Sequence, residues 1–134
     1  MRADDSTQAE VSALVRETYG RLSTPGSNPA ELFTHPDITV AGSGQGELMP
    51  GPEVVGGASA AIASWGFTWT ADEITVWSEG DVAWAQVLGT VHTIRDGVED
   101  DVPYWTTGVF ARGTGGAWQW RYWGGAEPQE DPRV

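Results

Sequence analysis

The chain has 134 residues, a length that suits one domain and leaves no room for a second hydrophobic core. Its formal net charge of -12, with arginine as its only strongly basic residue type, excludes a surface built to bind nucleic-acid phosphates. The chain has no cysteine and no apolar run of membrane-spanning length, so we expect a cytoplasmic protein that uses neither disulfides nor a membrane.

The first part of the sequence predicts helices. Residues 5–22 carry apolar side chains at spacings of three and four, which is typical of an amphipathic helix, and Asp5 or Ser6 can cap its start. Residues 28–33 predict one or two further helical turns, which open on an Asn-Pro pair with Asn28 as the cap.

A short strand is expected at residues 38–41, and the glycines and prolines of residues 42–52 predict a loop. Residues 52–65 then predict another helix. Gly56 and Gly57 weaken that helix by about 1 kcal/mol each relative to alanine, so tertiary packing must support it.

From residue 67 onward the apolar pattern has the period of two residues that is typical of β-strands. A break in the phase at Asp72-Glu73 predicts a bulge, and Asp96-Gly97 predicts a hairpin turn. The expected strands are residues 67–77, 82–95, 101–112 and 117–125, and the tail from residue 127 is expected to be loose.

Helices followed by long, hairpin-linked strands are typical of an α+β fold with its helices on one face of the sheet. We expect a cone-shaped, curved antiparallel sheet of about four to six strands, packed on about three N-terminal helices. The inside of such a cone is a natural ligand site. Residues 1–134 are expected to form a single domain with an ordered core at about residues 6–127.

Several segments resemble a known family. Residues 31–40, with the sequence ELFTHPDITV, follow a helix that ends near Tyr19 and resemble the start of SnoaL-like domains, which belong to the nuclear transport factor 2-like superfamily. Residues 42–51 are similar to a loop that some of these proteins carry before their third helix. Strand motifs such as TGVFAR at residues 107–112 extend the likeness over roughly residues 8–128.

The resemblance implies a cystatin-like α+β barrel that forms a homodimer through the outer face of its sheet. It implies no single activity, because the superfamily includes ketosteroid isomerases, polyketide cyclases, epoxide hydrolases, dehydratases and non-catalytic binding domains. In the isomerases the catalytic base lies just past a motif like residues 38–40. This chain has Ala41 and Gly42 there, so the standard base is missing.

Five polar residues are candidates for chemistry on a carbonyl compound. Tyr19, Tyr104 and Arg121 would orient oxygen atoms, and Glu47 or Asp37 would handle protons. Three of the five also have a structural alternative: Asp37 can cap a turn, Glu47 can be a solvated loop residue, and the stem of Arg121 can cover a tryptophan.

Strand alternation suggests which side chains face the inside of the cone. It places Arg121 and Trp123 on the inner face of the last strand and assigns Trp118, Trp120 and Tyr122 to the opposite face. It also places His92 on the outer face, where a partner subunit would pack. The predicted ligand-binding residues are Trp65, Trp69, Val91, Thr106, Phe110 and Trp123.

Three kinds of function remain open. The first is an enzyme with cyclase, dehydratase or isomerase-like chemistry on a hydrophobic or aromatic carbonyl compound. The second is a non-catalytic domain that binds or sequesters such a ligand, and the third is an accessory dimerisation domain. We expect no cofactor and no metal, since the two histidines share no ligand-like spacing.

Overall fold

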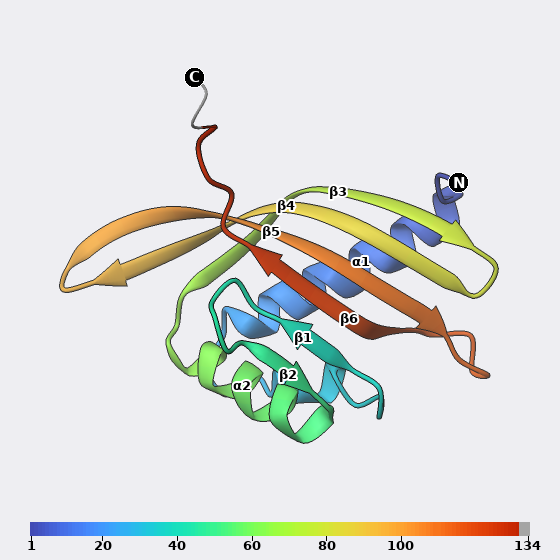
Figure 1. Cartoon of the computed structure of the whole chain (residues 1–134), viewed down its shortest axis with the longest axis horizontal. Helices are drawn as coiled ribbons and strands as arrows, with labels where there is room; N and C mark the ends of the chain where they lie inside the picture. The colour runs from blue at the N-terminus through green and yellow to red at the C-terminus, as the bar shows by residue number, and fades with distance from the viewer. Residues whose placement is uncertain (132–134) are drawn as a thin grey trace.

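The computed structural model describes residues 1–131. None of the helices in this part of the chain is long and apolar enough to cross a membrane. Its elements, shown in Figure 1, are α1 (Asp5–Leu22), the 3-10 helix η1 (Pro29–Leu32), β1 (Thr39–Ala41), β2 (Leu48–Pro50), α2 (Pro52–Ser64), β3 (Thr68–Glu79), β4 (Val82–Arg95), β5 (Val98–Arg112) and β6 (Trp118–Ala126).

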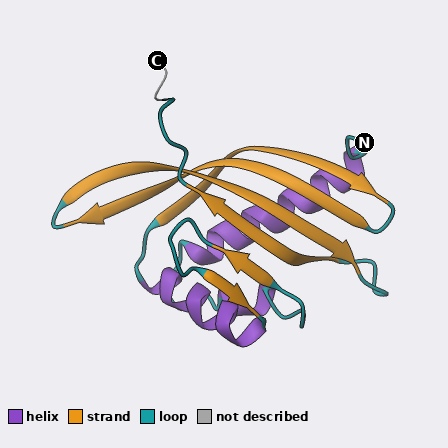
Figure 2. Ribbon diagram, viewed as in Figure 1, coloured by secondary structure: helices purple, strands orange, loops and turns teal. Residues whose placement is uncertain are grey.

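The strands of the described residues form one curved sheet in the order β2-β1-β6-β5-β4-β3. Neighbours pair antiparallel except β1 and β6, which run parallel. Helix α1 lies across one face of the sheet, and the β4–β5 hairpin extends past the helices as a two-stranded wing (Figure 2). The α+β fold with a curved sheet and its helices on one face is therefore confirmed, although the sheet does not close.

Helix α1 begins and ends where the sequence predicted, but a different residue caps it. The carboxylate of Asp4, rather than Asp5 or Ser6, accepts a hydrogen bond of 2.8 Å from the Thr7 backbone N–H. The buried side of α1 faces the sheet and comprises Thr7, Val11, Val15, Thr18, Tyr19 and Leu22.

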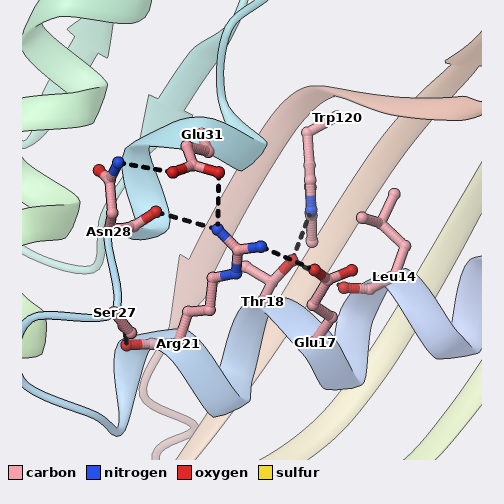
Figure 3. A network of polar contacts seen from close by, with 8 residues as sticks. All are labelled: Leu14, Glu17, Thr18, Arg21, Ser27, Asn28, Glu31 and Trp120. Atoms are coloured by element: carbon pink, nitrogen blue, oxygen red, sulfur yellow. Dashed lines mark hydrogen bonds and ion pairs between the residues drawn. The ribbon is translucent and has the colours of Figure 1, made fainter.

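Arg21, at the end of α1, holds η1 in place (Figure 3). Its guanidinium lies 3.0 Å from the Glu17 carboxylate and 3.4 Å from that of Glu31, and it donates to the Asn28 carbonyl. The side-chain amide of Asn28 donates to Glu31 instead of capping η1. This network fixes the chain that leads from α1 towards β1.

The segment at residues 42–52 is more regular than the predicted loop. Residues 48–50 form β2, which pairs with β1 and makes a hairpin whose loop spans residues 42–47. The Gly42 N–H donates to the Glu47 carbonyl at 2.9 Å and closes that loop. Such a short strand lacks the apolar alternation that reveals longer strands in a sequence.

Two bulges interrupt the long strands. One is the predicted bulge at Asp72, between the pairs Ala71–Gly89 and Glu73–Leu88. The other lies at Arg121, because Val109 pairs with Tyr122 while Phe110 pairs with Trp120.

The bulge at Arg121 corrects the predicted faces of β6. It shifts the alternation by one residue, so Trp118 and Trp120 share the buried face with Trp123, whereas Tyr122 is 36% exposed on the other face. The sequence-based prediction placed these tryptophans on opposite faces, because nothing in the sequence marks the extra residue of the bulge.

The closed end of the inner sheet face is a packed aromatic core. Trp120 is fully buried, its ring centroid lies 4.4 Å from that of Phe110 and 5.8 Å from that of Phe33, and its indole N–H donates to the Thr18 hydroxyl. Aromatic rings at these separations add to the free energy gained from burial alone.

Candidate functional site

A cavity and a cleft meet on the inner face of the sheet. The cavity has a volume of about 70 Å³ and the open cleft a volume of about 410 Å³. The residues that line both, and therefore mark their junction, are Glu47, Met49, Ala58, Ile62, Trp69 and Tyr104.

The two volumes suit different parts of a ligand. A cavity of about 150 Å³ holds benzene, and the inner cavity has about half that volume, so it suits a small substituent rather than a ring. The cleft falls within the range of ~300–1,000 Å³ found for small-molecule sites. A ligand would therefore place its main body in the cleft and a small group in the cavity.

Tyr104, on β5, supplies a polar group at the junction. Its phenol lies against the backbone of Gly125, where a Cβ would overlap the hydroxyl, and its ring centroid is 5.1 Å from that of Trp69. Burial raises the pKa of Tyr104, while a hydrogen bond with Trp123 acts in the opposite direction. Tyr104 therefore keeps its proton at neutral pH, and the hydroxyl can donate to a ligand.

Glu47 brings a carboxylate to the same junction from the loop between β1 and β2. Its carboxylate lies so close to the backbone of Gly42 that a Cβ on that glycine would overlap it. Gly42 itself lines the inner cavity. Residue 42 is a glycine and has no side chain, and the Glu47 carboxylate occupies the space that a side chain would take.

Trp69 and Trp123 form the aromatic wall of the cavity. Their ring centroids are 6.2 Å apart, and each contacts the ring of Tyr19 at 5.7 Å. The indole nitrogen of Trp69 is buried and has no hydrogen-bond partner among the described residues. An unpaired buried donor costs free energy, and a ligand oxygen would relieve that cost.

Three predicted site residues lie behind this wall rather than in the cavity. The Tyr19 hydroxyl and the Thr106 hydroxyl share a buried hydrogen bond of 2.7 Å, and Phe110 is fully buried against Trp120. Burial also raises the pKa of the Tyr19 phenol far above its ordinary value. These residues support the wall, and their predicted contact with a ligand stays a prediction.

The remaining predicted residues divide between the cleft and more distant positions. Trp65 and Val91 line the cleft together with Trp69. Asp37 is exposed in the turn before β1, where its backbone N–H donates to His35 Nδ1. Arg121 is not among the residues that line the cavity or the cleft, and its Nε atom is buried without a partner among residues 1–131.

His92 lies near the base of the wing, on the outer face as the alternation predicted. Its Nδ1 atom is 2.6 Å from the Asp101 carboxylate, and its Nε2 atom is 3.3 Å from the Thr70 hydroxyl. Within residues 1–131, no group of three or more His, Asp or Glu side chains gathers in a way that could hold a metal ion.

Several residues that line the cavity were not predicted from the sequence. They include Ala58 and Ile62 from α2 and Met49 from β2, an edge strand of the sheet. The spacing of four between Ala58 and Ile62 places them on one face of α2 and was a usable signal. Nothing in the sequence marked the role of Met49, because β2 itself was not predicted.

Comparisons with known proteins agree on the fold. A family model described as a SnoaL-like domain matches residues 27–125. No curated protein sequence matches the chain. A nuclear transport factor 2-like superfamily protein from Salmonella enterica superposes with a TM-score of 0.82 at 11% identity, over 96% of this chain and 95% of that one.

Two further solved structures carry functional descriptions of their own. A candidate dehydratase from Streptomyces avermitilis matches with a TM-score of 0.79 at 14% identity, over 94% of this chain and 99% of that one. A candidate ketosteroid isomerase from Shewanella frigidimarina matches with a TM-score of 0.70 at 14% identity, over 85% and 92%. At such identities the likeness concerns the fold alone.

Proposed function

This chain belongs to the SnoaL-like domain family of nuclear transport factor 2-like proteins, as its resemblance predicted, and we propose that it is an enzyme that transfers protons on a hydrophobic or aromatic carbonyl compound. One observation carries the proposal: Glu47 and Tyr104 line both the inner cavity and the cleft. A proton acceptor and a hydroxyl donor therefore meet where an apolar ligand would lie. The candidate isomerase and dehydratase among the structural relatives are consistent with such chemistry.

Proton abstraction next to a carbonyl needs a base and a donor for the negative charge that develops on oxygen. The Glu47 carboxylate takes the proton, and the electron pair of the broken C–H bond forms a carbon–carbon double bond. The carbonyl oxygen gains the charge and accepts a hydrogen bond from the Tyr104 hydroxyl. Return of the proton to another carbon completes an isomerisation, and the apolar walls keep the charged intermediate away from bulk water.

The test follows exchange of the protons next to the carbonyl of tetralone, an aromatic ketone, in heavy water by NMR. The protein is expected to accelerate the exchange, and Glu47→Gln is expected to reduce that acceleration by about 10²–10⁴-fold. Glu53→Gln removes an exposed carboxylate from the first turn of α2 and serves as the matched control.

A second variant moves the carboxylate without removing it. Gly42→Ala introduces a methyl group that overlaps the Glu47 carboxylate and should reduce exchange, whereas Gly113→Ala has nothing within 4 Å of its new Cβ and should not. Full exchange activity in both Glu47→Gln and Gly42→Ala would refute the assigned role of Glu47.

A non-catalytic binding domain is the second candidate function. Two features favour it: the aromatic wall of the cavity and the exposure of Glu47. A carboxylate in contact with water is a weaker catalytic base than one in a site that excludes water. The same experiment separates the two functions. If tetralone quenches the tryptophan fluorescence but its protons exchange no faster, the chain binds such ligands without catalysis.

We also propose that two copies of the chain associate through the outer face of the sheet. On this face Trp84, Val109 and Tyr122 lie in register on β4, β5 and β6, and Trp105 is 42% exposed. Aromatic residues are enriched at protein interfaces. Sedimentation should find a dimer that Trp105→Glu dissociates, and a monomeric wild type would refute the proposal.

A further inference from the structure

The cleft has charged side chains at both ends and uncharged, mostly apolar side chains between them. Among the described residues that line it, Glu47, Glu127 and Arg95 carry charge. The two carboxylates lie at the inner end. Glu47 lines the inner cavity together with Tyr104, and Glu127 directly follows Ala126, which pairs with Trp105 next to Tyr104. Arg95 lies at the other end, six residues beyond the point on β4 where Gly89 pairs with Tyr104.

The length of the cleft follows from the strand that forms its floor. Six residues of a β-strand span about 20 Å, which is longer than any single aromatic ring. Val91, on β4, and Val102, its register partner on β5, lie between the two ends, and Trp65 borders the same stretch. An elongated apolar body fits this part of the cleft.

Arg95 is prepared to bind an anion. Its guanidinium lies over the ring of Phe67, 5.7 Å from the centroid, which limits where the side chain can point. No carboxylate within residues 1–131 forms an ion pair with it, whereas Arg21 pairs with two carboxylates and Arg112 with one. Arg95 is exposed, so an anionic group can reach it without crossing the apolar floor.

We propose that the ligand of this cleft is an elongated, amphipathic carbonyl compound whose far end carries an anionic oxygen group bound by Arg95. The proposal rests on the proposed function for the inner end and adds the recognition of the outer end. The carboxylates around Tyr104 repel an anion and the guanidinium attracts it, so the ligand binds in one direction only. That direction places the carbonyl group at Glu47 and Tyr104.

The experiment compares two fluorescent probes of the same shape, toluidinonaphthalene sulfonate and its uncharged parent toluidinonaphthalene. Energy transfer from the tryptophans reports the binding of each. The wild-type chain should bind the sulfonate about fivefold more tightly than the parent, as expected for one partly exposed ion pair. Added salt should weaken the binding of the sulfonate but not that of the uncharged parent.

Two matched variants locate the preference. Arg95→Met keeps an apolar stem on Phe67 and should bind both probes equally. Arg2→Met removes a similar arginine, which lies 5.9 Å from the Trp77 ring and outside the cleft, and should keep the full preference. Unchanged binding of the parent compound by Arg95→Met would show that the variant is folded.

Three results would overturn the proposal. One is equal affinity of the wild-type chain for the two probes, and another is a preference that persists in Arg95→Met. In both cases binding of the parent compound would leave the proposed function intact. If neither probe binds, the apolar cleft is not a ligand site, and the proposed function fails as well.

Discussion

Both ends of the inner sheet face are rich in aromatic residues, but one end is a packed core and the other borders a pocket. At the closed end Phe110 and Trp120 are fully buried beneath α1 and η1. At the open end Trp69 and Tyr104 are only half-buried and border the cavity and the cleft. Aromatic residues on a strand therefore do not distinguish a core from a pocket. The elements that cover them make that difference.

The covers differ in how closely they approach the sheet. Helix α1 presses Thr18 onto Trp120, and η1 brings Phe33 against the same ring. Over the open end, α2 presents the small Ala58, and the β1–β2 loop presents Gly42. Small residues leave space that large ones would fill, and this space becomes the cavity.

The sharpest way to break this comparison is to remove one tryptophan from each end. Trp120→Ala should cost about 3–5 kcal/mol of unfolding free energy, because it opens a hole in a packed core. Trp69→Ala should cost only about 1–2 kcal/mol, since the ring already borders empty space. Urea unfolding measures both values, and equal losses would contradict the division into a core end and a pocket end.

Much of this fold could be predicted from periodicity alone. Helix α1 and strand β4 have the predicted bounds, and the bulge at Asp72 was visible as a break in alternation. The bulge at Arg121 was not, because Trp120 and Trp123 are both aromatic and the alternation around them is ambiguous. The pairing of β1 with β6 joins residues far apart in the chain, which local patterns cannot report.

A smaller change in stability is expected when the hydrogen bond between Tyr19 and Thr106, behind the wall of the cavity, is removed. Tyr19→Phe should cost about 1–2 kcal/mol, because it leaves the buried Thr106 hydroxyl without its partner. The double variant with Thr106→Val should recover much of that loss, because no buried polar group then stays unpaired. Urea unfolding of the single and double variants measures the coupling. Simple additivity would mean that the hydrogen bond contributes nothing.

The same tyrosine gives the chain a pH dependence. Burial raises the pKa of Tyr19 above the ordinary value of 10.0, so the folded chain keeps a proton that the unfolded chain loses in alkali. The free energy of unfolding should therefore be constant with respect to this group below pH 10 and fall as the pH rises beyond it. Tyr19→Phe should flatten the fall, and an unchanged slope would contradict the assignment.

The candidate site was only partly predictable. Tyr104, Trp69 and Trp123, which the sequence predicted as site residues, line the cavity, and so does Glu47, predicted as an acid in a glycine-rich loop. The sequence could not show that Glu47 fills the space left by Gly42, since that depends on the conformation of the hairpin loop. Alternation predicted an inner position for Arg121 because the bulge at this residue was not visible in the sequence. Arg121 lines neither the cavity nor the cleft.

The most direct test of the account is to follow the indole N–H signals of the eight tryptophans by NMR during a titration with tetralone. Trp69 and Trp123, in the wall of the cavity, should shift most, while Trp118 and Trp120 at the closed end should stay in place. Shifts confined to the closed end or to Trp84 on the outer face, with Trp69 and Trp123 unchanged, would contradict the assignment of the open end as the ligand site.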